Sequence, residues 1–175
     1  MDQLLLVDEF DNVIGYASKE DAHKTPMLHR AFSVFLYNGN KLLVQKRAKG
    51  KYHSGGLIAN TCCSHPRTDD ILGEAATRLH YETGIKIKAI DLKELFSFKY
   101  LTKFNDNLYE HEYDHVIVGK YSGGFEINKD EVSELKWMDI DKLSADLIKN
   151  PQKYASWFVI CAPKVIEYIK KNKSL

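Results

Sequence analysis

The chain carries its clearest helical pattern in residues 69–84, whose sequence is DDILGEAATRLHYETG. The apolar residues of this stretch recur at the spacing of one helix face, and they are Ile71, Leu72, Ala75 and Leu79. Asp69 and Asp70 suit the positive end of a helix dipole, and Gly84 is a typical C-terminal cap. The stretch therefore predicts an amphipathic helix that begins after Asp70 and ends at Gly84.

Segments rich in β-forming residues lie on both sides of this helix. The strands predicted before it are residues 4–7, 13–17, 31–37, 41–46 and 57–61. Asn38-Gly39 favours a type I′ hairpin turn, and the loops predicted after that hairpin are residues 48–56 and 62–68. The strands predicted after the helix are residues 85–90, 95–101, 109–121 and 134–138.

Helices return only at the end of the chain, at residues 141–148 and 156–171, and Pro163 is expected to kink or delay the second. No internal repeat, low-complexity tract or linker divides the sequence. Strands around one central helix, with helices added at the C-terminal end, predict an α/β (α+β) sandwich.

Composition bounds the class of protein. Of 175 residues 44% are hydrophobic and 28% are charged, so we expect one globular domain over residues 1–175. With 25 Lys and Arg against 24 Asp and Glu, the net charge of +1 argues against nucleic acid or a membrane as partner. The sequence shows no secretory signal and no run of transmembrane length, and three cysteines make no disulfide framework. We expect a cytoplasmic protein.

Two glutamates and three histidines form a candidate metal site. Glu110 and Glu112 are two residues apart in a predicted strand, so their carboxylates project from the same face. His23, His29 and His65 lie in predicted loops or at strand edges, and imidazoles with carboxylates suit zinc or another transition metal. The alternative is a solvated strand face with structural histidines, because the spacing is not that of a zinc finger.

Cys63 is a candidate acid or base. It lies two residues before His65 in the loop that precedes the helix, where nearby positive charge or a metal lowers the pKa of a thiol. Small packing residues are the alternative interpretation of Cys62 and Cys63.

Other charged residues have an ordinary interpretation when they are taken alone. Three of them recur every four residues along the helix, as in a surface ladder of ion pairs: Glu74, Arg78 and Glu82. Taken alone, three further cations are interpreted as solvated surface charges: Lys19, Arg47 and Lys51.

Four stretches, taken together, favour the functional interpretation of these residues over the structural one. They are Leu28-His29-Arg30-Ala31-Phe32-Ser33, Asn60-Thr61-Cys62-Cys63-Ser64-His65-Pro66, Tyr81-Glu82-Thr83-Gly84 and Glu110-His111-Glu112. In this order they resemble the type I isopentenyl diphosphate isomerase family, which is built on the Nudix fold, and the resemblance runs from about Lys19 to Trp157. It implies a Nudix-type sandwich with a mixed central sheet flanked by helices. The implied activity interconverts isopentenyl diphosphate and dimethylallyl diphosphate in isoprenoid biosynthesis.

The Nudix hydrolase signature, G-x5-E-x7-R-E-U-x-E-E-x-G-U, can be laid on the chain so that it ends at residues 82–85. Only Glu82 of its carboxylate cluster survives, because Thr77-Arg78 replaces Arg-Glu and Tyr81 replaces the first paired glutamate. Asp69 stands at the first glutamate. Hydrolysis by metal-activated water needs several carboxylates, whereas isomerisation needs the diphosphate held intact. The pattern favours an isomerase.

The resemblance also implies a set of ligands. One divalent metal, commonly zinc, manganese or magnesium, would be bound by His23, His29, His65, Glu110 and Glu112. A second ion, Mg²⁺, would meet the substrate diphosphate through Glu82 and the backbone carbonyl of Cys63. The residues that match the diphosphate contacts of the family are Lys19, Arg47, Lys51 and Arg78.

The implied reaction needs one proton delivered to a terminal methylene and another removed from the carbon nearer the diphosphate. By resemblance Cys63 and Glu112 are the acid and base pair, and Tyr100 assists Glu112. Between the two transfers the substrate resembles a tertiary carbocation, which an indole face stabilises while it excludes water. By resemblance Trp157 is the residue whose indole would face this carbocation.

Two departures from the family pattern stand out. The interval between His23 and His29 is one residue short, and Gly55-Gly56-Leu57-Ile58 stands where Pro-Gly and an aromatic residue are frequent. Two other classes stay open: a Nudix hydrolase of a nucleoside diphosphate derivative, and a metal-stabilised binding module without turnover. The module would leave Cys63, Tyr100 and Trp157 unexplained. We expect a monomer whose partner is a small diphosphate.

Overall fold

The sheet of the computed structural model, which describes residues 3–172, is organised around β3 (His29–Asn38). This strand pairs antiparallel with β4 (Lys41–Arg47) and β6 (Cys62–Ser64), and parallel with β8 (Leu108–Lys120). Every residue of β3 except the last is buried, as expected of a strand that is covered on both faces. β3 therefore lies at the centre of a mixed sheet.

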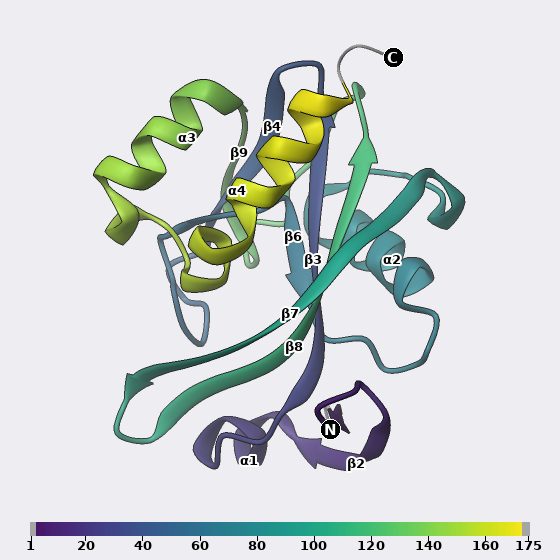
Figure 1. The fold of residues 1–175 in the computed structure, drawn as a ribbon, viewed down its shortest axis with the longest axis vertical. Coiled ribbons are helices and arrows are strands. Elements are labelled where there is room, and N and C mark those ends of the chain that lie inside the picture. The colour runs from purple at the N-terminus through teal and green to yellow at the C-terminus, as the bar shows by residue number, and fades with distance from the viewer. Residues whose placement is uncertain (1–2, 173–175) are drawn as a thin grey trace.

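The remaining strands extend the sheet outward from these four. They are β1 (Gln3–Val7), β2 (Val13–Ser18), β5 (Ile58–Ala59), β7 (Leu92–Asn105) and β9 (Val132–Asp139). β1 joins β3 to β2, β7 pairs antiparallel with β8, and β4 holds β5 and β9. β7 and β8 form a long hairpin that crosses the front of the sheet in Figure 1.

Helices cover both faces of this sheet (Figure 1). α3 (Ile140–Lys149) and α4 (Ser156–Lys171) pack on one face, and α2 (Ile71–Thr83) packs on the other. Alternate residues of β3 enter the two cores: Phe35 lies in the core under α3 and α4, and Val34 in the core under α2. The predicted α+β sandwich is confirmed. The first two and last three residues of the domain expected over 1–175 lie outside the described residues.

The predicted central helix is confirmed as α2. Asp70 caps its start, because an Asp70 carboxylate oxygen accepts a hydrogen bond from the Gly73 amide at 3.0 Å. Gly84 ends it in the left-handed region at φ 68°, and a Cβ there would lie 2.9 Å from the Glu126 carbonyl oxygen. Both hairpins are also present, as β1 with β2 and β3 with β4.

Several local predictions are wrong. Residues 85–90 form no strand. Ile85 and Ile87 pack into the core under α2 from an irregular segment, and a 3₁₀ turn, η1 (Ala89–Asp91), follows. The predicted loop at 62–68 begins with β6, which pairs with β3. The β3–β4 turn is centred on Gly39-Asn40, and of these two only Gly39 has a positive φ, so it is not type I′.

Two more helical segments depart from the predictions. α1 (Lys19–Lys24), which was not predicted, begins where the Ser18 hydroxyl oxygen accepts from the Asp21 amide at 3.0 Å. A 3₁₀ turn, η2 (Pro151–Lys153), precedes α4, and α4 runs past Pro163 without delay. No helix within residues 3–172 is long and apolar enough to span a membrane.

Candidate functional site

One pocket gathers most of the predicted site residues. It opens where the β7–β8 hairpin, the start of α4 and the β4–β5 segment meet α1 and β6. The four predicted diphosphate contacts line it, as do the four predicted catalytic residues: Lys19, Arg47, Lys51, Arg78, Cys63, Glu112, Tyr100 and Trp157. His65 and Glu110 belong to the same lining.

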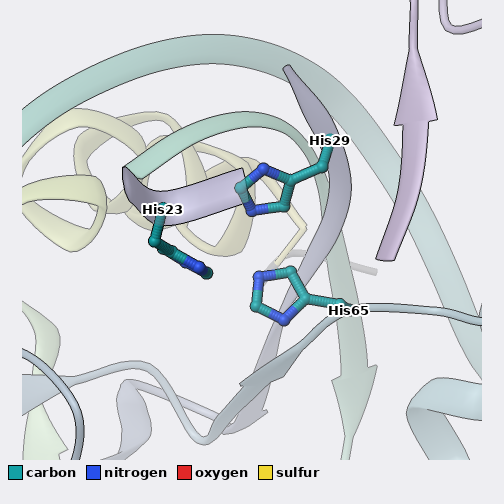
Figure 2. Close-up of side chains that lie close together, drawn as sticks. All are labelled: His23, His29 and His65. Atoms are coloured by element: carbon teal, nitrogen blue, oxygen red, sulfur yellow. The ribbon is translucent and has the colours of Figure 1, made fainter. Parts of the chain in front are cut away.

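The three predicted histidines face one another (Figure 2), and His65 joins them to the lining of this pocket. The ring centroids of His29 and His65 are 5.0 Å apart, those of His23 and His29 are 5.1 Å apart, and those of His23 and His65 are 6.1 Å apart. His23 lies in α1, whereas the sequence had suggested a loop or a strand edge. The helix brings its imidazole over the start of β3, so the short interval to His29 is compatible with the cluster.

Two of these imidazoles are oriented by the backbone. The Nδ1 atom of His23 lies 2.5 Å from the Lys19 carbonyl oxygen, and that of His29 lies 2.8 Å from the Met27 carbonyl oxygen. Each carbonyl therefore fixes the proton on Nδ1 and leaves Nε2 with its lone pair. Both Nε2 atoms are buried, without a hydrogen-bond partner among residues 3–172. Burial lowers the pKa of His29 to about 4, which keeps it neutral.

The two predicted carboxylates complete the cluster. Glu110 and Glu112 are both buried on β8 while the residue between them is not, so the solvated strand face is wrong. The donor atoms of His65, Glu110 and Glu112 lie within 4.8 Å of one another. Glu110 Oε2 is a third buried atom without a partner in the described chain. Orphaned Nε2 and carboxylate atoms that converge in this way fit a divalent cation.

Glu112 is held by two neutral groups. Its Oε1 lies 2.9 Å from His65 Nε2, and its Oε2 accepts a hydrogen bond of 2.5 Å from the Tyr100 hydroxyl. Burial and the nearby charges of Glu110 and Asp114 raise the pKa of Glu112 well above its ordinary value. Burial and these neighbouring charges therefore favour the protonated form of the Glu112 carboxyl.

Cys63 differs from the sequence expectation in its electrostatics. Burial raises the pKa of its thiol to about 12, although the Arg47 guanidinium opposes that rise. The expectation of a lowered pKa is wrong for these surroundings, because loss of solvent outweighs one cation. Arg47 Nη1 lies 3.4 Å from the Cys63 Sγ, within reach of a developing thiolate.

Two of the four pocket cations, Lys51 and Arg78, pair with acidic residues. Glu131 Oε2 pairs with Lys51 and, at 3.0 Å, with Arg78 Nη2. Arg78 Nε also donates to Glu82 Oε1 at 2.8 Å, and Glu82 is buried. The predicted surface ladder is present only in its Arg78–Glu82 pair, in which Glu82 is buried, because Glu74 instead accepts from the backbone amide of residue 67 at 2.8 Å.

Trp157 is buried at the start of α4 and is fixed in orientation. Its indole Nε1–H donates to Asn60 Oδ1 at 2.9 Å. The Arg47 guanidinium lies 5.1 Å from the ring centroid, as in a cation–π pair. The indole therefore belongs to the wall of the pocket, although the sequence alone allowed an ordinary core residue.

Several residues of the site had no motif to mark them. His53 lies in the predicted loop 48–56 and contacts Glu110, and Asp114 accepts from the Ser33 hydroxyl at 2.8 Å beneath Glu112. Asp114 has the same alternation as the predicted pair, since Glu110, Glu112 and Asp114 are each two residues apart. His53 carries no such signal, because only the fold brings its loop to β8.

Comparisons with known proteins agree with this geometry. The NUDIX domain model matches residues 27–158. The protein named isopentenyl-diphosphate Delta-isomerase 2 of Aromatoleum aromaticum is 47% identical over 167 residues, which cover 94% of this chain and 87% of that protein. The Photorhabdus laumondii protein of the same name is 48% identical over 161 residues, 90% of this chain and 89% of that protein. The crystal structure of DR0079 from Deinococcus radiodurans has a TM-score of 0.70 at 20% identity, covers 97% of this chain and 98% of its own, and bears on the fold alone.

Proposed function

Because this chain belongs to the isopentenyl-diphosphate Delta-isomerase family of NUDIX domain proteins, we propose how its own residues move the double bond of isopentenyl diphosphate. The chain is an isomerase, and its reaction gives dimethylallyl diphosphate. The observation that carries the proposal is that two protonatable groups, Cys63 and Glu112, line one pocket with an indole and four cations. A proton can be added and another removed there without release of phosphate.

The metal site supports the same assignment. We assign His23, His29, His65, Glu110 and Glu112 as ligands of one divalent metal, which is zinc, manganese or magnesium. Glu82 and the backbone carbonyl of Cys63 are assigned to a Mg²⁺ ion that comes with the diphosphate. When bound, such ions fix the positions of the ligand side chains and of the diphosphate, and they neutralise negative charge.

The proton transfers are assigned from the surroundings of each group. Glu112, whose raised pKa favours the protonated form, delivers a proton to the terminal methylene carbon, where a C–H bond forms, with Tyr100 hydrogen-bonded to the carboxyl as a relay. We assign the base to Cys63, which must first ionise because burial raises the pKa of its thiol to about 12; the thiolate, which Arg47 stabilises, then removes a proton from the carbon nearer the diphosphate. The double bond reforms between that carbon and its neighbour, so atoms and charge balance.

The charge pattern of the pocket supports binding of an intact diphosphate. Lys51 and Arg78 share Glu131, and Lys19 and Arg47 line the same pocket. Burial and the neighbouring charge of Lys51 lower the pKa of Lys19, so an anion that enters stabilises the ammonium form of Lys19. Only Glu82 remains of the carboxylates that a hydrolase needs to activate water.

A comparison of two products tests the assignment. The purified chain is incubated with Mg²⁺ and either isopentenyl diphosphate or a panel of nucleoside diphosphate derivatives. We expect dimethylallyl diphosphate from the first and no phosphate release from either. Phosphate release from the nucleotide panel, with no dimethylallyl product, would instead favour the hydrolase alternative.

Trp157→Phe is expected to lower turnover more than substrate affinity. Phenylalanine keeps most of the apolar area but weakens the cation–π stabilisation of a carbocation, which is worth about 1 to 2 kcal/mol in a desolvated site. That corresponds to a loss of about 5- to 30-fold in kcat, with KM nearly unchanged. Steady-state kinetics and binding of an ammonium analogue of the diphosphate measure both quantities. A variant that melts earlier but turns over and binds the analogue normally would make Trp157 a core residue only.

His65→Ala and Glu82→Gln are expected to affect different ions. His65→Ala removes an imidazole from the histidine cluster and should lower the metal content of the protein without substrate. Glu82→Gln should leave that content unchanged and weaken Mg²⁺-dependent diphosphate binding. Metal analysis after dialysis and calorimetric titration with diphosphate separate the two. A folded His65→Ala protein with full metal content would remove that residue from the site.

A further inference from the structure

His53 makes a direct contact to Glu110 that neither the motifs nor the family assignment explains. It lies between β4 and β5, and its Nε2 atom is 2.7 Å from Glu110 Oε1. Both side chains are buried, with 7% of His53 and 3% of Glu110 exposed. A buried hydrogen bond of this length fixes the orientation of the carboxylate plane.

The imidazole of His53 is itself held on several sides. It stacks on Phe104 of β7, with ring centroids 4.6 Å apart and an interplanar angle of 18°. Its edge meets Trp157 at 5.8 Å and 88°. The Nδ1 atom lies 3.3 Å from the Ser54 hydroxyl, which can donate to it and so leave the ring proton on Nε2. In this tautomer His53 donates to Glu110.

This donation leaves the second oxygen of Glu110 free. Oε1 accepts from His53, whereas Oε2 is buried and has no hydrogen-bond partner in the described residues. His23 and His29 are arranged in the same way, because a backbone carbonyl holds one ring nitrogen and the other is left without a partner. In three ligands of the cluster, therefore, one nitrogen or oxygen atom is held by a hydrogen bond to the protein, and the other has no partner in the described residues.

We propose that His53 is a positioning residue of the divalent-metal site, which holds Glu110 so that Oε2 is presented to the ion. The inference rests on the metal site of the proposed function, and it adds His53, whose ligand atom also lies within 4.8 Å of those of His23 and Glu110. His53 acts through Glu110, since its Nε2 is occupied by the Glu110 hydrogen bond. Partners of this kind typically change metal affinity by about 10- to 100-fold.

Binding of Mn²⁺ to the full chain without substrate tests the proposal. His53→Phe keeps an aromatic ring to stack on Phe104 but has no donor, and His53→Gln keeps a donor without the ring. We expect His53→Phe to weaken Mn²⁺ binding by about 10- to 100-fold, and His53→Gln to restore most of that loss. His80→Phe, at an exposed histidine of α2, is the matched control and should bind as the parent does.

Free Mn²⁺ is counted by electron paramagnetic resonance, and the unfolding temperature of each variant without metal is measured alongside. Unchanged affinity in a folded His53→Phe protein would overturn the proposal. An equal loss in His53→Phe and His53→Gln would also overturn it, because His53 would then bind the ion itself. If His53→Phe does not fold, the proposal still requires His53→Gln to bind within a few-fold of the parent. Because turnover is not measured, the result stands apart from the test of the isomerase activity.

Discussion

Cys63→Ala is expected to reduce isomerisation by about 10²- to 10⁴-fold, which is the range for loss of a general acid or base. The change removes the only protonatable group at that position of the pocket, while Arg47 and the other cations stay in place. Diphosphate binding should therefore change little, so the loss falls on kcat and not on KM. Product formation measured over long incubations, with calorimetric binding of the substrate, checks both parts.

Cys62→Ala is the matched control for this variant. Both cysteines lie on β6, and because neighbouring strand residues face opposite ways, Cys62 packs in the core under α2 while Cys63 meets the other face. We expect Cys62→Ala to cost about 1 kcal/mol of stability and to retain most of the activity. Equal losses in the two variants, or full activity in Cys63→Ala, would remove Cys63 from the chemistry.

The second large effect is expected for Glu112→Gln. Glutamine has the shape of the carboxyl group but cannot transfer a proton, so kcat should fall by about 10²- to 10⁴-fold. Since Glu112 is also assigned as a metal ligand, the assay is run with saturating Mn²⁺ and the bound metal is measured. Glu134→Gln, at an exposed position of β9, is the control and should behave as the parent does.

Glu112→Asp sharpens the same experiment. Aspartate keeps the acid but withdraws it by one methylene from the Tyr100 hydroxyl. In the parent this hydroxyl lies 2.5 Å from Glu112 Oε2. We expect activity between that of the parent and that of Glu112→Gln. If Glu112→Gln with its full metal content turns over within tenfold of the parent, the carboxyl group is a ligand alone and another acid must be found.

Much of the fold was predictable because its signals are local. The bounds of α2 follow from Asp70, an apolar stripe and Gly84, and those of α4 were predicted to the residue. The strands β3, β4 and β8 carry apolar runs of the kind that strands covered on both faces require.

What the sequence could not supply depends on contacts between distant segments. β6 exists because residues 62–64 meet the middle of β3, and nothing in three residues indicates that partner. The pKa of Cys63 follows from its burial in the folded protein, so a rule based on neighbouring cations had the wrong sign. His53 reaches Glu110 across the fold, and a lone histidine in a loop carries no signal of such a contact.

The central claim is that this chain adds a proton to one carbon of isopentenyl diphosphate and removes one from another through Glu112 and Cys63. Incubation of the purified chain in D₂O with Mg²⁺ and isopentenyl diphosphate, followed by nuclear magnetic resonance, measures this directly. Carboxyl and thiol protons exchange with solvent, so the account predicts dimethylallyl diphosphate with deuterium in a methyl group and the diphosphate intact. Unlabelled dimethylallyl diphosphate, or free phosphate without an isomerised product, would contradict it.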